Sequence, residues 1–391
     1  MKSTRRVFIL FMLAGVPFLS AAQVPETKSA ARQKYFAYLG TYTNKTNSKG
    51  IYAYRFDAAT GKLAAGSLAA ASTEPSFVAV HPDGKFLYAV SETGDFEGKK
   101  SGAVNAYAIG SRTGKLTLLS QIASGGADPC YISFDKTGKF VLVANYTGGS
   151  IAVFPILADG KLGERTAFVQ HTGVGANKER QEGPHAHWIE TSPDNRFVFA
   201  VDLGLDEILV YKFDAQNGTL APNDPPYLKL QAGSGPRHLV FAPNGKFAYL
   251  TSELSSTVTA LSYDAANGAF TPLQSLSTLP AGYSGANDTA EIAVHPSGKF
   301  LYDSNRGHNS IAIFAIDPAD GKLTSRGTVS TEGKTPRNFV IDPTGAYLLA
   351  ENQESNTIVV FKIDQSTGGL TATGQKIPAP ATVCIAFTPA Q

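Results

Sequence analysis

The chain has 391 residues, of which 43% are hydrophobic and 17% charged, and its formal net charge is +2 at pH 7. This nearly neutral balance gives no basic footprint for nucleic acid, so we expect a small uncharged or anionic ligand. The two cysteines, Cys130 and Cys384, are expected to be buried free thiols, because the repeat described below places them too far apart for a disulfide.

The first 22 residues have the pattern of an export signal. Basic residues between Lys2 and Arg6 precede an apolar run over residues 7–19, which is too short to span a bilayer, and Ser20-Ala21-Ala22 supplies a small-X-small cleavage site. The sequence therefore predicts a signal peptide over 1–22, of the ordinary or twin-arginine type. The mature protein is expected to be periplasmic or secreted, with no membrane attachment after cleavage.

One five-residue turn signal recurs six times along the rest of the chain. Each copy joins two short apolar runs, and its Gly or Asn supplies the positive φ that a tight hairpin needs. The copies are 54, 57, 50, 53 and 47 residues apart, a spacing typical of β-propeller blades. They begin at Pro82, Lys136, Pro193, Pro243, Pro296 and Pro343. His81 and His295 precede two of these turns and are expected to bond within the loops.

The two ends of the chain complete a seventh unit. Residues 382–389 resemble the first strand of a unit, whereas residues 36–63 resemble its remaining strands. The sequence therefore predicts an all-β, seven-bladed β-propeller in a single domain over residues 35–391, after a short linker over 23–34. Strands from both ends close the last blade, which removes open sheet edges.

Aligning the units on the turn predicts which side chains share one rim of the ring, because neighbouring strands run antiparallel. Polar residues concentrate at this end of the strands. The column six positions before each turn reads Ser76, Cys130, His187, Arg237, Ala290, Arg337 and Val383, and the next residues include His238, Glu291 and Asn338. The column at the end of the second strand reads Tyr42, Glu92, Tyr146, Leu203, Glu253, Arg306 and Gln353, and Asn145 and Asn305 directly precede two of these residues.

Arginines facing a cavity suit bidentate binding of a carboxylate or phosphate, although a lattice of ion pairs with rim acids would also account for them. The unit containing His185 and His187 has two extra residues before its turn, which indicates a β-bulge that directs one histidine inward. A zinc site would need further ligands at suitable spacing, and none accompanies them, so we expect no metal. No cofactor motif or nucleophile elbow occurs.

Several motifs resemble the bacterial 6-phosphogluconolactonase family of seven-bladed propellers, which includes the fungal carboxymuconate lactonising enzymes. The resemblance runs from about residue 35 to the C-terminus. It is carried by Ala-Asn-Tyr at 144–146, Gly-Pro-His-Ala-His at 183–187, Gly-Pro-Arg-His at 235–238, Ser-Asn-Arg-Gly-His at 304–308 and Thr-Pro-Arg-Asn at 335–338.

The resemblance implies a lactone substrate and no required metal or other cofactor. It implies a catalytic set of His187 (or His185), Arg237, Glu253 and Arg306. Substrate-binding roles are then expected for His185, His238, Glu291, Asn305, Arg337 and Asn145. The ring is expected to be a monomer or weak dimer.

Three functions follow from these patterns. The first is hydrolysis of a sugar lactone, in which Arg237 and Arg306 hold the substrate oxygens while Glu253 or His187 activates water. The second is lactonisation of a muconate by the same groups. The third is a propeller that only binds a ligand or a protein. The lactone is expected to be of the 6-phosphogluconolactone type or another aldonolactone. Because export would separate the chain from the cytoplasmic pentose-phosphate lactone, another aldonolactone or a lactone from plant or algal matter is favoured.

Overall fold

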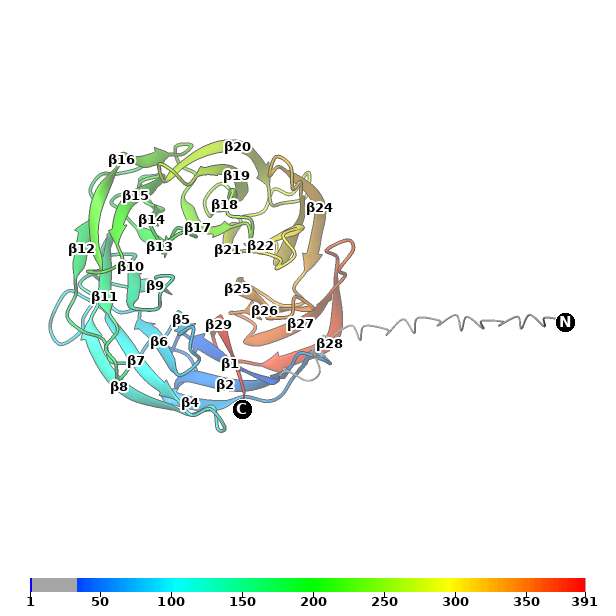
Figure 1. The fold of residues 1–391 in the computed structure, drawn as a ribbon, viewed down its shortest axis with the longest axis horizontal. Coiled ribbons are helices and arrows are strands. Elements are labelled where there is room, and N and C mark those ends of the chain that lie inside the picture. Colours follow the sequence, from blue (N-terminus) through cyan, green and yellow to red (C-terminus); the bar gives the residue numbers. More distant parts are fainter. Residues whose placement is uncertain (2–33, 391) are drawn as a thin grey trace. The chain divides into compact units, whose positions relative to one another are not determined.

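The computed structural model describes residue 1 and residues 34–390, so the predicted signal peptide and nearly all of the predicted linker lie outside the described residues. From Lys34 onward the described residues form 29 strands in seven antiparallel sheets around a ring (Figure 1). The predicted seven-bladed β-propeller is therefore confirmed. Within the described residues, no helix is long and apolar enough to cross a bilayer.

Six blades are four-stranded sheets in which the first strand lies nearest the centre of the ring and the fourth lies at its periphery (Figure 1). Their strands are, blade by blade, β5 (Val78–Val80), β6 (Phe86–Ser91), β7 (Ala103–Ile109) and β8 (Leu116–Ala123); β9 (Pro129–Phe134), β10 (Phe140–Asn145), β11 (Ser150–Pro155) and β12 (Ala167–Gln170); β13 (Ala186–Thr191), β14 (Phe197–Asp202), β15 (Glu207–Asp214) and β16 (Thr219–Lys229); β17 (Pro236–Phe241), β18 (Phe247–Ser252), β19 (Thr257–Asp264) and β20 (Ala269–Ser277); β21 (Asp288–Val294), β22 (Phe300–Arg306), β23 (Ser310–Ile316) and β24 (Leu323–Ser330); β25 (Pro336–Ile341), β26 (Tyr347–Asn352), β27 (Thr357–Ile363) and β28 (Leu370–Pro378).

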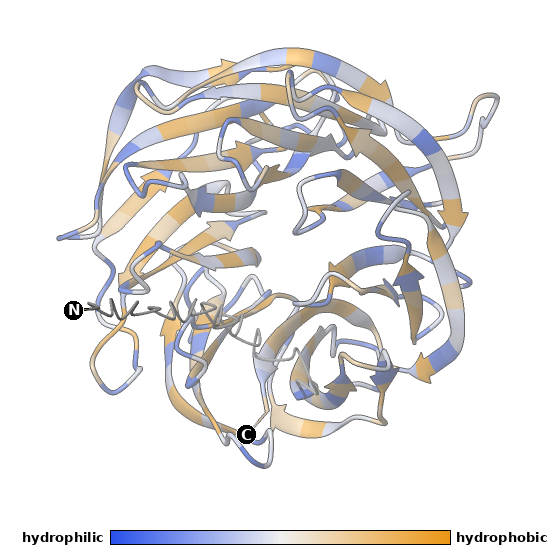
Figure 2. Cartoon of the chain, turned by 45° about the vertical axis from the view of Figure 1, so that its right-hand side comes forward, coloured by the Kyte–Doolittle hydropathy of each residue, from blue (hydrophilic) through white to orange (hydrophobic). Residues whose placement is uncertain are grey.

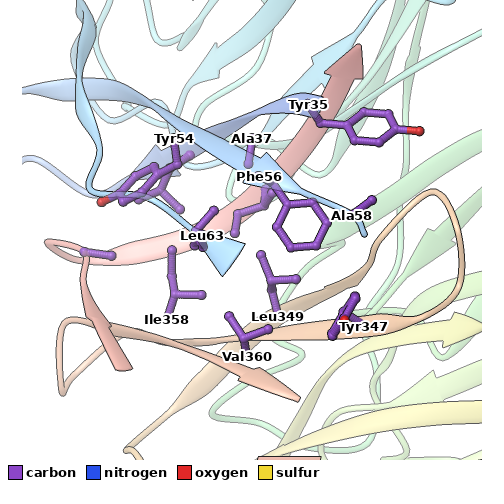
Figure 3. Close-up of a cluster of buried hydrophobic side chains, with 13 residues drawn as sticks. Tyr35, Ala37, Tyr54, Phe56, Ala58, Leu63, Tyr347, Leu349, Ile358 and Val360 are labelled. Carbon is purple, nitrogen blue, oxygen red and sulfur yellow. The ribbon is translucent and has the colours of Figure 1, made fainter. Parts of the chain in front are cut away.

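The seventh blade is built from both ends of the described chain. It comprises β29 (Thr382–Pro389), β1 (Lys34–Thr41), β2 (Gly50–Asp57), β3 (Lys62–Leu63) and β4 (Ser67–Ala71). The inner strand β29 pairs antiparallel with β1, as the sequence predicts. Phe56 and Leu63 of this blade pack with Leu349 and Val360 of the preceding one in a buried apolar cluster (Figure 3). This packing joins the closing blade to the ring.

The predicted turns have the expected backbone. Their Gly or Asn residues have φ between 62° and 75°. His81 and His295, expected to bond within the loops, each hold a glycine carbonyl of the next blade's turn at 2.8 Å. Hydrophobic residues gather in bands along the strands, whereas the loops are mainly hydrophilic (Figure 2). Cys130 and Cys384 are buried and free, as predicted.

A β-bulge interrupts the start of six of the seven inner strands. In each blade one extra residue of the inner strand lies between two paired positions, and a bulge of this kind bends the strand and changes the direction of a side chain. The sequence predicts a bulge only beside His187, but in the structure six blades have one. The bulged residues include Cys130, His187, Arg237, Arg337 and Val383.

One acidic side chain lies inside the sheet packing. Asp303 of β22 is fully buried, and neither of its carboxyl oxygens has a hydrogen-bond partner among the described residues. Burial raises the pKa of this carboxyl well above its ordinary value. Burial therefore favours the neutral, protonated form of Asp303 in the folded protein.

Asp303→Asn is expected to flatten the pH dependence of stability. The wild-type free energy of unfolding falls as pH rises above the carboxyl's unfolded pKa of about 3.9, because the unfolded chain releases a proton that the folded state keeps. The loss approaches ~1.4 kcal/mol per pH unit, and an amide removes it. Urea unfolding of both proteins at pH 5 and pH 7 measures this change. An equal stability difference at the two pH values would contradict it.

Candidate active site

Four of the predicted residues meet at one rim of the ring. His187 and Arg237 occupy the bulges of β13 and β17, Glu253 directly follows β18, and Arg306 ends β22. Because β17 and β18 are antiparallel, Arg237 and Glu253 lie at the same end of their sheet. Arg237 Nη1 lies 2.9 Å from Glu253 Oε2, and Arg306 Nη2 lies 2.7 Å from the same oxygen.

A third guanidinium completes the cluster. Arg180, from the long connection between β12 and β13, places Nη2 2.6 Å from Glu253 Oε1. Burial alone would raise the pKa of the Glu253 carboxyl, but Arg306, then Arg237 and Arg180, hold it far below its ordinary value. Glu253 therefore stays ionised. The hypothesis that Glu253 activates water does not fit, because taking a proton would weaken three ion pairs.

Both ring nitrogens of His187 also contact other side chains. Its Nε2 accepts a hydrogen bond from Arg237 Nη1, so the neutral ring carries its proton on Nδ1, which lies 3.6 Å from Cys130 Sγ. Burial, followed by the charge of Arg237, lowers the pKa of His187 well below its ordinary value. The imidazole is thus neutral and supports Arg237, and the alternative hypothesis that it activates water is disfavoured.

The cluster opens on a cavity of about 240 Å³. This is slightly below the range of about 300–1,000 Å³ that is usual for ligand pockets, and it suits a small substrate. The lining residues are Glu92, Cys130, Tyr146, Arg180, His187, Arg237, Glu253, Asp288, Arg306 and Arg337. We call this cavity the rim pocket. A narrow extension of this pocket is lined in part by Phe77, His238 and Asn338.

Arg337 differs from the other pocket arginines. Its guanidinium carbon lies 5.5 Å from the centre of the Tyr42 ring, but the guanidinium makes no hydrogen bond or ion pair with residues 34–390. Arg237 and Arg306 also keep N–H groups that bond to nothing in this part of the chain, including the buried Nε of Arg306. The rim pocket therefore offers cationic donors to an anionic or carbonyl oxygen.

A second carboxylate, the half-buried Glu92, lies in the same pocket but has different partners. The Tyr42 hydroxyl donates to its two oxygens at 2.9 and 3.1 Å, and the Ser76 hydroxyl donates to Oε2. Burial raises the pKa of Glu92, and the charge of Arg337 only partly opposes this. The two pocket carboxylates, Glu92 and Glu253, thus differ in their tendency to take a proton.

The structure does not bring His185 into the rim pocket. Its ring stacks on Tyr146 with centroids 4.5 Å apart, Nδ1 lies 3.1 Å from the Tyr146 carbonyl oxygen, and Nε2 lies 3.2 Å from Glu182. The bulge in β13 falls at His187 rather than at His185. Of the two histidines that the sequence leaves open, His187 is the one that lines the pocket.

Asn145 and Asn305, expected to bind substrate, lie outside the rim pocket and are fully buried. Asn145 Nδ2 donates to the Ser150 hydroxyl at 3.1 Å. Asn305 Nδ2 donates to the Thr278 carbonyl at 3.1 Å and to the Ser310 hydroxyl at 3.2 Å. Their amides hold the strand connections together, which explains their position at the end of the second strands.

Two other predicted residues, His238 and Glu291, lie outside the rim pocket. His238 lines the narrow extension, with Nδ1 3.3 Å from Glu291. Glu291 accepts a hydrogen bond from Asn338 at 2.6 Å and does not line the rim pocket. Glu291 thus lies against the side chains of His238 and Asn338, which line the narrow extension.

Some pocket residues were not chosen from the sequence. Glu92 and Tyr42 stand in the same repeat column as Glu253, so the repeat contained their signal. Arg180 lies in a connection outside the repeat, which gave no signal for it. Among the residues described, no group of three or more His, Cys, Asp or Glu side chains is arranged to hold a metal ion.

Comparison with known proteins identifies relatives of this chain. Residues 36–387 match the sequence model of the family described as "Lactonase, 7-bladed beta-propeller". The chain is 39% identical over 307 residues to 6-phosphogluconolactonase of Bacillus subtilis, covering 78% of this chain and 85% of the relative. It is 39% identical over 312 residues to 6-phosphogluconolactonase of Formosa agariphila, covering 78% and 85%. The solved structure of the Pseudomonas aeruginosa periplasmic gluconolactonase superposes with a TM-score of 0.86 and 34% identity, covering 92% of this chain and 100% of that one.

Glu253→Gln is expected to lower the free energy of unfolding at pH 7 by about 3–5 kcal/mol, because it leaves buried guanidiniums without their counter-charge. The wild-type contribution is present above the unfolded pKa of about 4.3 and is lost as pH falls through the depressed folded pKa. Urea unfolding measures the change. Glu182→Gln is the control, since it removes an exposed carboxylate from an ion pair with His185 and should cost at most about 1 kcal/mol. Equal, small losses in both variants would show that the cluster does not stabilise the fold.

Proposed function

We infer, because this chain belongs to the lactonase family of seven-bladed β-propellers, that it hydrolyses a sugar lactone to the corresponding acid. The observation that carries the assignment is the rim pocket itself, in which Arg237 and Arg306 are fixed by Glu253 while Arg337 is unpaired. A lactone has one electron-rich carbonyl oxygen, and its hydrolysis produces one carboxylate. Both are ligands for guanidinium groups.

In the proposed reaction, water attacks the lactone carbonyl carbon and the carbonyl oxygen becomes an oxyanion. The N–H groups of Arg237 and Arg306 that make no internal hydrogen bond stabilise this charge. Glu253 keeps both guanidiniums in place before the substrate arrives, so little reorganisation is needed at the moment of reaction. Arg337 holds a further substrate oxygen.

The alternative of a ring that only binds other molecules predicts rim charges that are fully paired and no open pocket. The unpaired Arg337 and the cavity of about 240 Å³ speak against it. Lactonisation of a muconate would use similar groups in reverse, but the relatives named above are described as lactonases of sugar acids. Hydrolysis of a sugar lactone is therefore the function that the geometry supports best.

We further propose that the substrate is an unphosphorylated aldonolactone encountered after export. The signal-peptide pattern of residues 1–22 and the similarity to a periplasmic gluconolactonase support this location. In the rim pocket, four arginines face three carboxylates, which leaves about one net positive charge when all are ionised. This charge suits a monoanionic acid product better than a phosphate dianion.

The assay is acid release, followed by pH-stat, from glucono-δ-lactone, other aldonolactones and 6-phosphogluconolactone. Arg337→Ala is expected to lower kcat/KM by about 10²–10³-fold, the usual effect of losing one charge-stabilising donor. Because Arg337 forms no hydrogen bond or ion pair with residues 34–390 but does contact the Tyr42 ring, its loss should lower the free energy of unfolding by no more than about 1–2 kcal/mol. Arg196→Ala, at an exposed turn arginine paired with Asp194, is the control and should retain full activity.

Either of two results would overturn the proposal. The first is no acid release above the spontaneous rate from any lactone of the panel, which contradicts the reaction. The second is a fully active Arg337→Ala variant, which contradicts the placement of substrate in the rim pocket. A preference for 6-phosphogluconolactone would refute only the unphosphorylated substrate.

A further inference from the structure

We propose that Glu92 is a catalytic residue, the general base that takes a proton from the attacking water in the hydrolysis proposed above. This inference rests on the proposed function. The arginine cluster explains how the carbonyl oxygen is held, but it supplies no proton acceptor. Glu92 is a carboxylate that lines both the rim pocket and its narrow extension, and it forms no ion pair with the described residues.

The other candidate bases in the rim pocket either already bind other protein groups or have no hydrogen bond that orients them. Glu253 is held by three guanidiniums, and both ring nitrogens of His187 face other side chains. The Cys130 thiol lies among the carbonyl oxygens of β13. Asp288 lines the pocket, but its carboxylate has no hydrogen-bond donor among residues 34–390 to orient it. Glu92 alone combines a position in the pocket with two oriented donors.

The position of Glu92 follows from the ring. It directly follows β6, as Glu253 directly follows β18, so the two carboxylates occupy equivalent places in different blades. Their blades lie across the central opening from one another (Figure 1). A lactone whose carbonyl oxygen is held by Arg237 and Arg306 therefore has the Glu253 side of the pocket behind that oxygen and Glu92 on the opposite wall.

The surroundings of Glu92 raise the pKa of its carboxyl above the ordinary value. Burial raises its pKa, the charge of Arg337 lowers it, the Ser76 and Tyr42 hydroxyls lower it further by stabilising the ionised form, and Asp128 raises it. The other charged or titratable side chains that line these two cavities with Glu92 include Arg237, His187, Cys130 and His238. The balance leaves a pKa above the ordinary glutamate value, and a base works best when its pKa approaches the working pH.

The step is balanced without any further reactant. As the water oxygen bonds to the lactone carbonyl carbon, one water proton passes to a Glu92 carboxylate oxygen and the electron pair of the carbonyl becomes the oxyanion. Collapse of this intermediate restores the carbonyl and breaks the bond from carbon to the ring oxygen. The leaving oxygen takes the proton back from Glu92. The products are the hydroxy acid and the ionised Glu92.

The test compares Glu92→Gln with wild type on the best lactone of the panel. A general base contributes about 10²–10⁴-fold, so kcat should fall by that factor while KM changes little. A group that only binds a substrate hydroxyl would instead raise KM. Glu190→Gln is the matched control, because Glu190 is another carboxylate that accepts a tyrosine hydroxyl, from Tyr131, but lies outside the rim pocket. It should keep wild-type kcat.

The pH profile supplies a second readout that does not depend on Glu92→Gln folding. Wild-type kcat/KM should fall as pH drops through the Glu92 pKa, since the base must be ionised. Tyr42→Phe removes a hydrogen bond to the ionised form, so the acid limb should move to higher pH. Any of three results would overturn the assignment. Tyr42→Phe could leave the acid limb of the kcat/KM profile in place, Glu92→Gln could keep full kcat, or Asp288→Asn could be the variant that loses the acid limb. An inactive wild type would refute the proposed function itself, which is a distinct outcome.

Discussion

The contact between the Glu253 carboxylate and the guanidiniums of Arg180, Arg237 and Arg306 is the interaction on which the candidate site depends. Buried like charges repel one another strongly, and only a buried counter-charge allows Arg237 and Arg306 to lie side by side at the rim. The same contact fixes both guanidiniums before a substrate binds. It also removes Glu253 from proton chemistry, which is why the proton acceptor has to be sought on another wall of the pocket.

The propeller makes this arrangement from a repeat. Six of the seven blades have a bulge where the inner strand begins, and the residue in that bulge varies among the blades. The bulged residues of neighbouring blades also bond to one another, from Cys130 to His187, from His187 to Arg237, and from Arg237 to the Ala290 carbonyl. The scaffold is therefore regular, and its asymmetry lies in a single layer that faces the rim pocket.

The fold was predictable because its signals are local. A Gly or Asn with positive φ marks each turn, the spacing of the turns gives the blades, and the complementary strands at the two ends give the closure. The rim residues were also predictable, since antiparallel pairing places the two columns at one end. What each rim residue does was not predictable. Asn305 and Glu253 stand in neighbouring columns, yet one bonds to loops and the other to arginines, and only the three-dimensional partners distinguish them. Arg180 lies outside the repeat altogether.

The most direct test of the account is a crystal structure of the protein with D-gluconate, the product of the simplest aldonolactone. The account predicts that the gluconate carboxylate lies in the rim pocket, within about 3 Å of N–H groups of Arg237, Arg306 or Arg337, with Glu92 facing its carboxyl carbon. A gluconate bound elsewhere on the ring, or bound in this pocket without an arginine contact, would contradict it.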